Sequence, residues 1–257
     1  MQGKFAALLG GLFVMSAVGI GSPPLYAQSM EVKEKPALYS YQANWQVPRA
    51  KWAEFEKPSP SDKLLTQALG SGALVAYGVD KVEVHSPEGP THDSFWSAMS
   101  MAAVMDMLDS FSVGPPDPVL QSATKHWDGI YVSHFYNWKS GTYKGAYTHI
   151  SYYKLKATAP DDALETVSKN FIVPLMEKLL ADGSIVEYEI DVEAIHTESP
   201  AGFWVDYITP NSAGLDKVNA ALGQAIKTNT FAGPAFNAMI ETADHRDYLS
   251  RSNVTYK

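Results

Sequence analysis

Histidine, tyrosine and aspartate carry the chemistry open to this chain, because its 257 residues include no cysteine. That composition excludes a thiolate nucleophile, a cysteine-ligated metal and disulfide bonds. His85 and His196 follow two similar strand patterns and could shuttle protons near neutral pH. Alternatively, each histidine closes a strand end by bonding to hairpin backbone. The pattern favours this structural role and leaves both residues as weak catalytic candidates.

Asp80 and Asp191 also occupy equivalent positions. Asp191 shares one parity of its strand with several glutamates, while the other parity is apolar. Such alternation is typical of a strand with one buried and one solvated face. We therefore expect both aspartates in solvent, because an acid–base role would need burial and a raised pKa.

Metal and cofactor motifs are absent from the sequence. The seven histidines form neither a His-Glu-x-x-His nor a His-x-His pattern. The nearest grouping is His85 with His92 and Asp93 across one hairpin. There is no G-x-S-x-G elbow, P-loop or G-x-G-x-x-G loop. We expect no metal and no cofactor.

The stretch 126–153 is dense in rings, with nine aromatic residues and three histidines. Alternate residues of such strands would face a barrel interior, where an aromatic-lined cavity suits a planar or apolar small molecule. His134 and His149 are further weak catalytic candidates. The alternative is that the rings only fill an interface core. The candidate ligand-binding residues are Tyr131, Phe135, Tyr136, Trp138, Tyr147 and Tyr152.

These residues must be positioned by elements that recur along the chain. An offset of 111 residues aligns the two halves, and a hairpin longer by three residues in the first half interrupts the match. The aligned pairs include Ser40-Tyr41 with Ser151-Tyr152, Tyr77 with Tyr188, His85 with His196, and Phe95-Trp96 with Phe203-Trp204. We predict two repeats, residues 36–140 and 141–257, packed directly against each other.

Each repeat has the pattern of a β-α-β-β-α-β unit. In the first, we predict strands at 38–46, 73–85, 92–96 and 131–138, with helices from 48 and over 99–111. In the second, we predict strands at 149–156, 184–197, 203–208 and 247–254, with helices over 160–180 and from 211 or 212 to 226. This order is the split ferredoxin-like motif, so the fold class is α+β.

Two such units with aromatic-rich sheets resemble the dimeric α/β barrel superfamily in a fused, single-chain form. The resemblance implies two sheets that face each other, related by a pseudo-twofold axis, and close a barrel around a small cavity. The superfamily includes antibiotic-biosynthesis-type monooxygenases, haem-degrading enzymes and muconolactone-isomerase-like proteins. No family catalytic motif is present, so the resemblance assigns no residue a role.

The first 27 residues have the pattern of a signal peptide. Lys4 precedes an uncharged apolar run, residues 5–20, which is shorter than the roughly 20 residues that span a bilayer. We expect cleavage near Ala27 and a periplasmic or secreted protein. The remaining chain has 28 acidic and 19 basic residues, which argues against nucleic-acid and anionic-membrane partners.

Three functions remain open from the sequence. The first is a protein that binds a small hydrophobic or aromatic molecule between the two repeats. The second is a cofactor-independent enzyme, monooxygenase-like or isomerase-like, that uses histidine and tyrosine as acid and base. The third is a structural or interaction protein whose barrel is filled by side chains.

Overall fold

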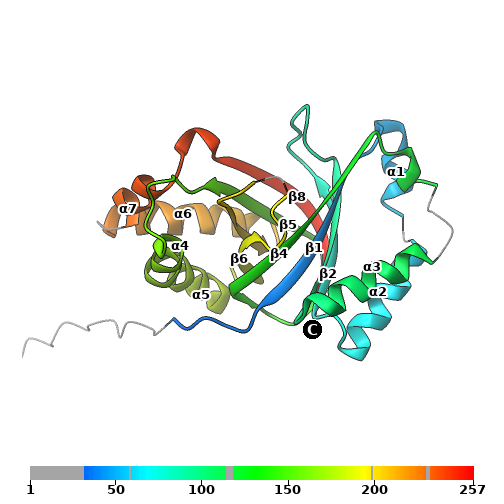
Figure 1. The fold of residues 1–257 in the computed structure, drawn as a ribbon, viewed down its shortest axis with the longest axis horizontal. Coiled ribbons are helices and arrows are strands. Elements are labelled where there is room, and N and C mark those ends of the chain that lie inside the picture. The colour runs from blue at the N-terminus through cyan, green and yellow to red at the C-terminus, as the bar shows by residue number, and fades with distance from the viewer. Residues whose placement is uncertain (1–31, 58, 114–117, 198, 230–231) are drawn as a thin grey trace, which may run out of the picture. The chain divides into compact units, whose positions relative to one another are not determined.

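Eight antiparallel strands of the described residues close into one barrel in the computed structural model, and the helices pack on its outside (Figure 1). The structure describes residues 32–257, except 58, 114–117, 198 and 230–231. The expected signal peptide lies outside the described residues. The strands are β1 (Leu38–Gln46), β2 (Ala76–Val82), β3 (His92–Ala98), β4 (Lys125–Trp138), β5 (Gly141–Lys154), β6 (Glu187–Glu193), β7 (Gly202–Thr209) and β8 (Arg246–Tyr256).

The strand order around the barrel is β1-β3-β2-β8-β5-β7-β6-β4. Each half of the chain thus contributes four neighbouring strands, β4-β1-β3-β2 and β8-β5-β7-β6. The halves join where β2 pairs with β8 and where β4 pairs with β6. The α+β class and the β-α-β-β-α-β order of each half are as predicted. That the halves arose as a tandem repeat stays a prediction.

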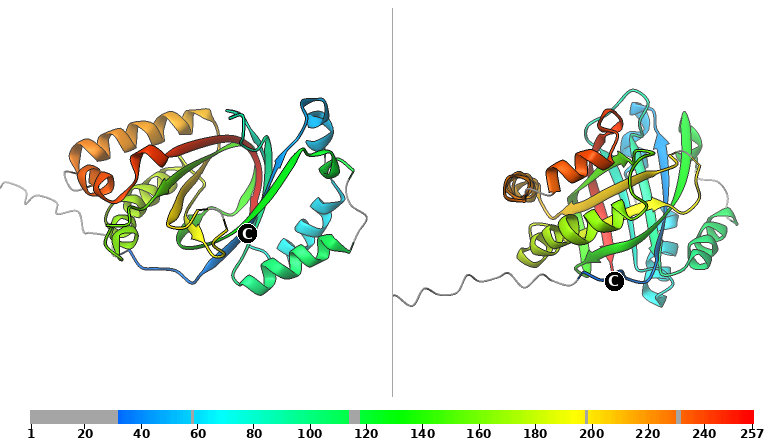
Figure 2. Two further views of the ribbon diagram at one scale, coloured as in Figure 1. Left: turned by 45° about the horizontal axis from the view of Figure 1, so that its top comes forward. Right: turned by 60° about the vertical axis from the view of Figure 1, so that its left-hand side comes forward.

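The helices lie on two separated flanks of the barrel (Figure 2). The first half carries α1 (Trp52–Phe55), α2 (Pro60–Ser71) and α3 (Met101–Ser112), with short 3-10 turns at Arg49–Lys51 and Leu120–Ser122. The second half carries α4 (Ala163–Val167), a π-helical turn (Ser168–Ile172), α5 (Val173–Asp182), α6 (Ser212–Thr228) and α7 (Ala232–Met239), with a 3-10 turn at Thr242–Asp244. Within the described residues, no helix is both long enough and apolar enough to span a bilayer.

Local sequence signals explain where these helices begin and end. Ser59 and Asp62 form a reciprocal capping box at the start of α2. The Asn211 side chain accepts from the Gly214 amide, so the predicted cap of α6 is confirmed. Gly183 ends α5 at φ +79°, a conformation that glycine adopts without strain. The predicted helix end at residues 182–183 is thereby confirmed.

One predicted helix, 160–180, is interrupted. Pro174 stands in its middle and has no amide hydrogen to donate to the preceding turn. The chain widens into the π-helical turn immediately before it, and α5 begins with Pro174 in its first turn. Such turns recur at functional sites, and this one turns Phe171 and Ile172 towards a cavity described below.

Two apolar cores lie between the sheet and the helices, one in each half. The first-half core includes Leu74, Trp96 and Val104, and the second-half core includes Tyr188 and Phe203; all five are at most 4% exposed. The three strand residues among them, Trp96, Tyr188 and Phe203, face outward from the barrel, towards the helices. The polar parity of the same strands therefore faces its interior.

The prediction that Asp80 and Asp191 lie in solvent is wrong. Asp80 is 2% exposed and Asp191 is 6% exposed, and Glu187 and Glu189 on the same parity are buried as well. The period-two alternation of polar and apolar residues does hold along β6. Closure of the barrel removes the solvated face of the sheet, so the polar parity is enclosed instead of exposed.

The second strand of each half is shorter than predicted. β2 ends at Val82 and β6 ends at Glu193, so His85 and His196 lie in the following hairpins and are exposed. The His85 ring stacks on Trp52 at 5.0 Å. The structural role that the sequence favoured for both histidines, a ring nitrogen bonded to hairpin backbone, stays a prediction.

Candidate functional site

A cavity of about 330 Å³ lies in the second half, between the outer face of β5 and β7 and the helices that cover it. This volume is within the usual range for small-molecule sites. The helices contribute an apolar wall, which includes Phe171, Leu175, Met176, Leu222 and Phe236. The polar lining comes mainly from the strand side. An arrangement of this kind suits an apolar molecule that carries one polar group.

The polar residues of this cavity converge on the Asp247 carboxylate. The Ser151 hydroxyl donates to Asp247 Oδ1 at 2.8 Å, and His149 Nε2 lies 3.9 Å from the same oxygen. His245 Nε2 lies 3.3 Å from Asp247 Oδ2. The Ser151 hydroxyl is also 3.5 Å from His149 Nδ1. One carboxylate thus contacts a serine and two histidines at the wall of an apolar cavity.

The register of the sheet explains why these residues meet. His149, Ser151 and Tyr153 alternate along β5, so their side chains leave the same face of the strand. Ser151 stands opposite Asp247 in the pairing of β5 with β8. His245 immediately precedes β8, and its Nδ1 donates to the Tyr152 carbonyl at 2.9 Å.

Aromatic rings hold both histidines in fixed orientations. His149 stacks on Tyr207 with centroids 4.9 Å apart and an interplanar angle of 13°. His245 stacks on Tyr153 at 4.5 Å and 8°, and Tyr153 meets the edge of Phe236 at 4.8 Å. Stacking of this kind restricts ring rotation, so each imidazole presents a defined edge to the cavity.

Burial sets the protonation state of the site. It lowers the pKa of His149 below its ordinary value of 6.5; Asp247 acts in the opposite direction, and His245 adds to the lowering. Burial also raises the pKa values of Tyr153 and Tyr207, so both phenols stay protonated. At neutral pH His149 is therefore a neutral imidazole, which can accept a proton from a bound molecule.

Of the four predicted catalytic histidines, only His149 lines this cavity. His85 and His196 are exposed, and the exposed His134 ring lies 3.1 Å from the Lys35 carbonyl. Sequence reasoning missed His245 and Asp247 as site residues. Their signal in the sequence was the His-x-Asp spacing at the start of β8. Only the pairing of β8 with β5 brings these two side chains next to His149 and Ser151.

The six predicted ligand-binding aromatics do not share one cavity. Ligand binding by these residues stays a prediction. Tyr131 lines a small cavity inside the barrel, Phe135 packs in the second-half core, Tyr136 donates to the Pro36 carbonyl, Trp138 donates to the Lys257 carbonyl, Tyr147 packs under Arg251, and Tyr152 packs against Trp204. These contacts are partly shared, because Tyr131 and Tyr152 both pack against Trp204 and Tyr136 stacks on Trp138. The small cavity inside the barrel is lined by the aromatic residues Phe95, Tyr131 and Tyr256 together with acidic side chains.

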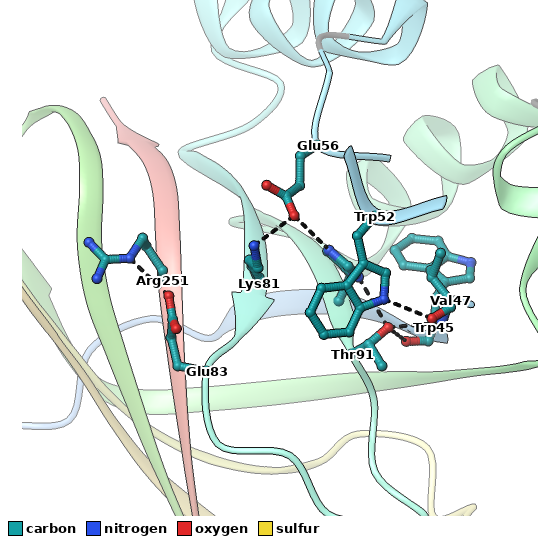
Figure 3. Close-up of polar contacts among 9 residues, drawn as sticks. Trp45, Val47, Trp52, Glu56, Lys81, Glu83, Thr91 and Arg251 are labelled. Atoms are coloured by element: carbon teal, nitrogen blue, oxygen red, sulfur yellow. Dashed lines mark hydrogen bonds and ion pairs between the residues drawn. The ribbon is translucent and has the colours of Figure 1, made fainter. Parts of the chain in front are cut away.

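A second polar cluster, in the first half, includes Glu56 and Lys81 beside Trp52 (Figure 3). The buried His92 lies next to it. Glu56 Oε1 lies 2.8 Å from Lys81 Nζ and 3.6 Å from His92 Nε2. Burial lowers the pKa of His92. The neighbouring Asp93 points to the opposite side, into the barrel, so the hairpin does not gather His85, His92 and Asp93. Across the part of the chain that the structure describes, no three histidine, aspartate or glutamate side chains are placed to hold a metal ion.

Comparisons with known proteins identify solved structures with the same fold, but they do not identify an activity for this chain. No protein-family model matches the chain, and no curated protein matches it. Solved structures that share the fold include the following two. One, from Lactobacillus acidophilus and provisionally assigned as a monooxygenase, has a TM-score of 0.61 and 11% identity over 86% of this chain and 97% of its own. Another with the same provisional assignment, from Fusobacterium nucleatum, has a TM-score of 0.62 and 8% identity over 87% of this chain and 95% of its own.

At these identities the likeness concerns the fold alone. The two solved structures agree with the α+β barrel architecture of this chain.

Proposed function

We propose that the cavity of the second half binds a small, planar or apolar molecule and that His149 accepts a proton from it. One observation carries the proposal: a neutral, half-buried imidazole stands at the wall of a 330 Å³ apolar cavity, 3.9 Å from a carboxylate. A filled structural core would not leave that volume beside ionisable groups. The cavity lies within the second half. A ligand between the two repeats stays a separate prediction.

The reaction that fits this site begins with removal of a weakly acidic proton, from a phenol or from a carbon next to a carbonyl. His149 becomes an imidazolium, and the Asp247 carboxylate stabilises that charge. The Tyr207 hydroxyl, if it reaches the substrate oxygen, stabilises the resulting anion by hydrogen bonding. Return of the proton to another carbon would complete an isomerisation.

Oxidation by molecular oxygen is the second outcome open to the same anion. A CH₂ group and O₂ would give a carbonyl group and water, so the substrate itself supplies the electrons. The two neighbours provisionally assigned as monooxygenases support this version. Both versions need the same base in the same cavity.

We also propose that the protein is exported and that its two halves descend from one duplicated unit. The signal-peptide pattern of residues 1–27 supports export to the periplasm or the exterior. The matching strand order of the two halves supports duplication. We propose a small-molecule ligand as the partner, and neither nucleic acid nor membrane.

Binding is tested with 2-tetralone, a small bicyclic ketone with one aromatic ring and acidic protons next to its carbonyl. We expect saturable binding by ligand-observed NMR. Leu222→Trp, which places a large ring in the cavity wall, should abolish binding. Leu64→Trp, the same change at a 38% exposed site on α2, is the matched control and should bind normally. Saturable binding that survives Leu222→Trp would place the ligand elsewhere and refute the proposed site.

A further inference from the structure

The barrel encloses a second cavity, of about 50 Å³, whose wall is acidic. This volume holds only a few water molecules, at roughly 10–15 Å³ each. Six carboxyl side chains from four strands face it: Asp80 on β2, Asp93 on β3, Glu187, Glu189 and Asp191 on β6, and Asp206 on β7. The proposed reaction uses none of them, so this cluster needs an explanation of its own.

No basic side chain faces these acids in the described lining of the cavity. The other four strands contribute neutral groups: Ser40 and Gln42 from β1, Tyr131 from β4, Thr148 and Ile150 from β5, and Tyr256 from β8. Ionised carboxylates in this space would be uncompensated charges away from bulk water, which is a costly arrangement.

Pairing across the strands brings the acids close to one another. Asp80 stands directly opposite Asp93, and Glu189 stands directly opposite Asp206. Side chains of directly opposed residues approach closely, and like charges there repel. Two carboxyl groups at such a distance are accommodated when at least one of them is protonated.

Hydrogen bonding satisfies the cluster only in part. Gln42 Nε2 donates to Asp93 Oδ1 at 3.4 Å. Among the described atoms, one oxygen each of Asp80, Glu187 and Asp191 is buried with no hydrogen-bond partner, and these side chains are 2%, 2% and 6% exposed. A proton on such a carboxyl group turns an unpaired acceptor into a donor that can reach a neighbouring carboxyl oxygen or an enclosed water.

We propose that the barrel interior is a proton-loaded core, in which the enclosed acids retain their protons near neutral pH and the fold loosens as alkali removes them. This inference does not depend on the proposed function. The proposed effect comes from the six enclosed acids and not from surface carboxylates, because all six face the inside of a closed barrel.

Electrostatics gives the direction of the pH dependence. Burial raises the pKa values of Asp93 and Asp191 to about 7, and it raises those of Asp80, Glu187, Glu189 and Asp206 well above their ordinary range. Between the unfolded values near 4 and these folded values, the folded state binds more protons than the unfolded state. The stability that this provides is complete below about pH 4 and is lost as pH rises through about 7 and beyond.

The same strands connect the core to the proposed site. On β5, His149 faces the larger cavity and its neighbours Thr148 and Ile150 face the acidic interior. On β7, Tyr207 faces the larger cavity and Asp206 faces the interior. Loosening of the interior at high pH would therefore disturb the wall that holds His149.

The test is thermal unfolding, followed by circular dichroism from pH 4 to pH 9 in the presence of a chelator. We expect the midpoint to fall with rising pH by on the order of 10 °C. Asp191→Asn removes one buried titrating group and should reduce this fall. Asp106→Asn, at an exposed site on α3, should follow the unmodified chain. A midpoint that stays constant or rises with pH would overturn the proposal.

Two further measurements keep the proposal testable if the Asp191 variant does not fold. Infrared spectra of the unmodified chain at pH 7 should contain the carbonyl band of protonated carboxyl groups, and its absence would contradict a proton-loaded core. Calcium or magnesium added at pH 8 should leave the midpoint unchanged. A large increase with either ion would show that a metal cation, and not protons, compensates the interior.

Discussion

The pairing of His149 with Asp247 makes a quantitative prediction. Replacing Asp247 with asparagine removes the negative charge 3.9 Å from His149 Nε2 while keeping the side chain's size. The carboxylate raises the pKa of His149, so its removal should lower that pKa further. Loss of the Asp247 charge leaves the neutral imidazole of His149 unaffected but destabilises the imidazolium, which loses its ion-pair partner.

The size of the effect follows from Coulomb's law. Two unit charges at this separation interact by about 1 kcal/mol in bulk water and by about 4 kcal/mol near a protein surface. The Asp247 side chain is 50% exposed, so solvent screens the pair and the lower figure applies. About 1 kcal/mol corresponds to roughly a fivefold decrease in the proton affinity of His149.

The assay is an NMR titration of the histidine ring protons, with the His149 signal assigned by its loss in His149→Gln. The matched control is Asp128→Asn, which removes a carboxylate 2.9 Å from His126 in the first half and should leave the His149 midpoint unchanged. A His149 midpoint that is unaltered or higher in Asp247→Asn would refute the proposed electrostatic coupling.

Three substitutions test the packing that positions the site. Phe203→Ala removes a fully buried ring from the second-half core and should cost about 3–5 kcal/mol in urea unfolding, whereas a loss below about 1 kcal/mol would contradict that packing. Gly78→Ala places a methyl group 2.5 Å from the Phe95 ring and should destabilise by about 1–3 kcal/mol. Gly223→Ala, in α6 with open space around it, should instead stabilise by about 0.5–1 kcal/mol; equal effects of the two glycine changes would refute the steric argument.

Much of the fold could be predicted because the relevant signals are local. Strand alternation, helical spacing and the caps at Asn211 and Gly183 depend on residues a few positions apart. Barrel closure is not local. β6 alternates acidic and apolar residues as a half-exposed strand does, and only its pairing with β4 and β7 encloses the acidic face.

An irregularity in β4 explains why the predicted ligand-binding aromatics do not all face the same side of the sheet. A register shift in β4 between Ser133 and Phe135 changes which parity faces the interior. Tyr131 faces the interior, whereas Phe135 packs in the outer core. A strict alternation along the sequence would have put both rings on one face.

The candidate site could be predicted only in part from the sequence, because its residues meet through long-range strand pairing. His149 was identified from its place in a ring-rich strand. Its partner Asp247 lies almost a hundred residues later, and the two meet through the register of β5 with β8. The helical wall depends on how α5, α6 and α7 pack together, which no local pattern specifies.

The central claim is that His149 acts as a base on a molecule bound in the second-half cavity, and proton exchange tests it most directly. With 2-tetralone in deuterated buffer, NMR records how fast the acidic carbon protons are replaced by deuterium. We predict that the protein accelerates this exchange saturably and that His149→Gln still binds the ketone but loses the acceleration by about 10²-fold or more. Exchange at the same rate in His149→Gln, with binding intact, would contradict the account.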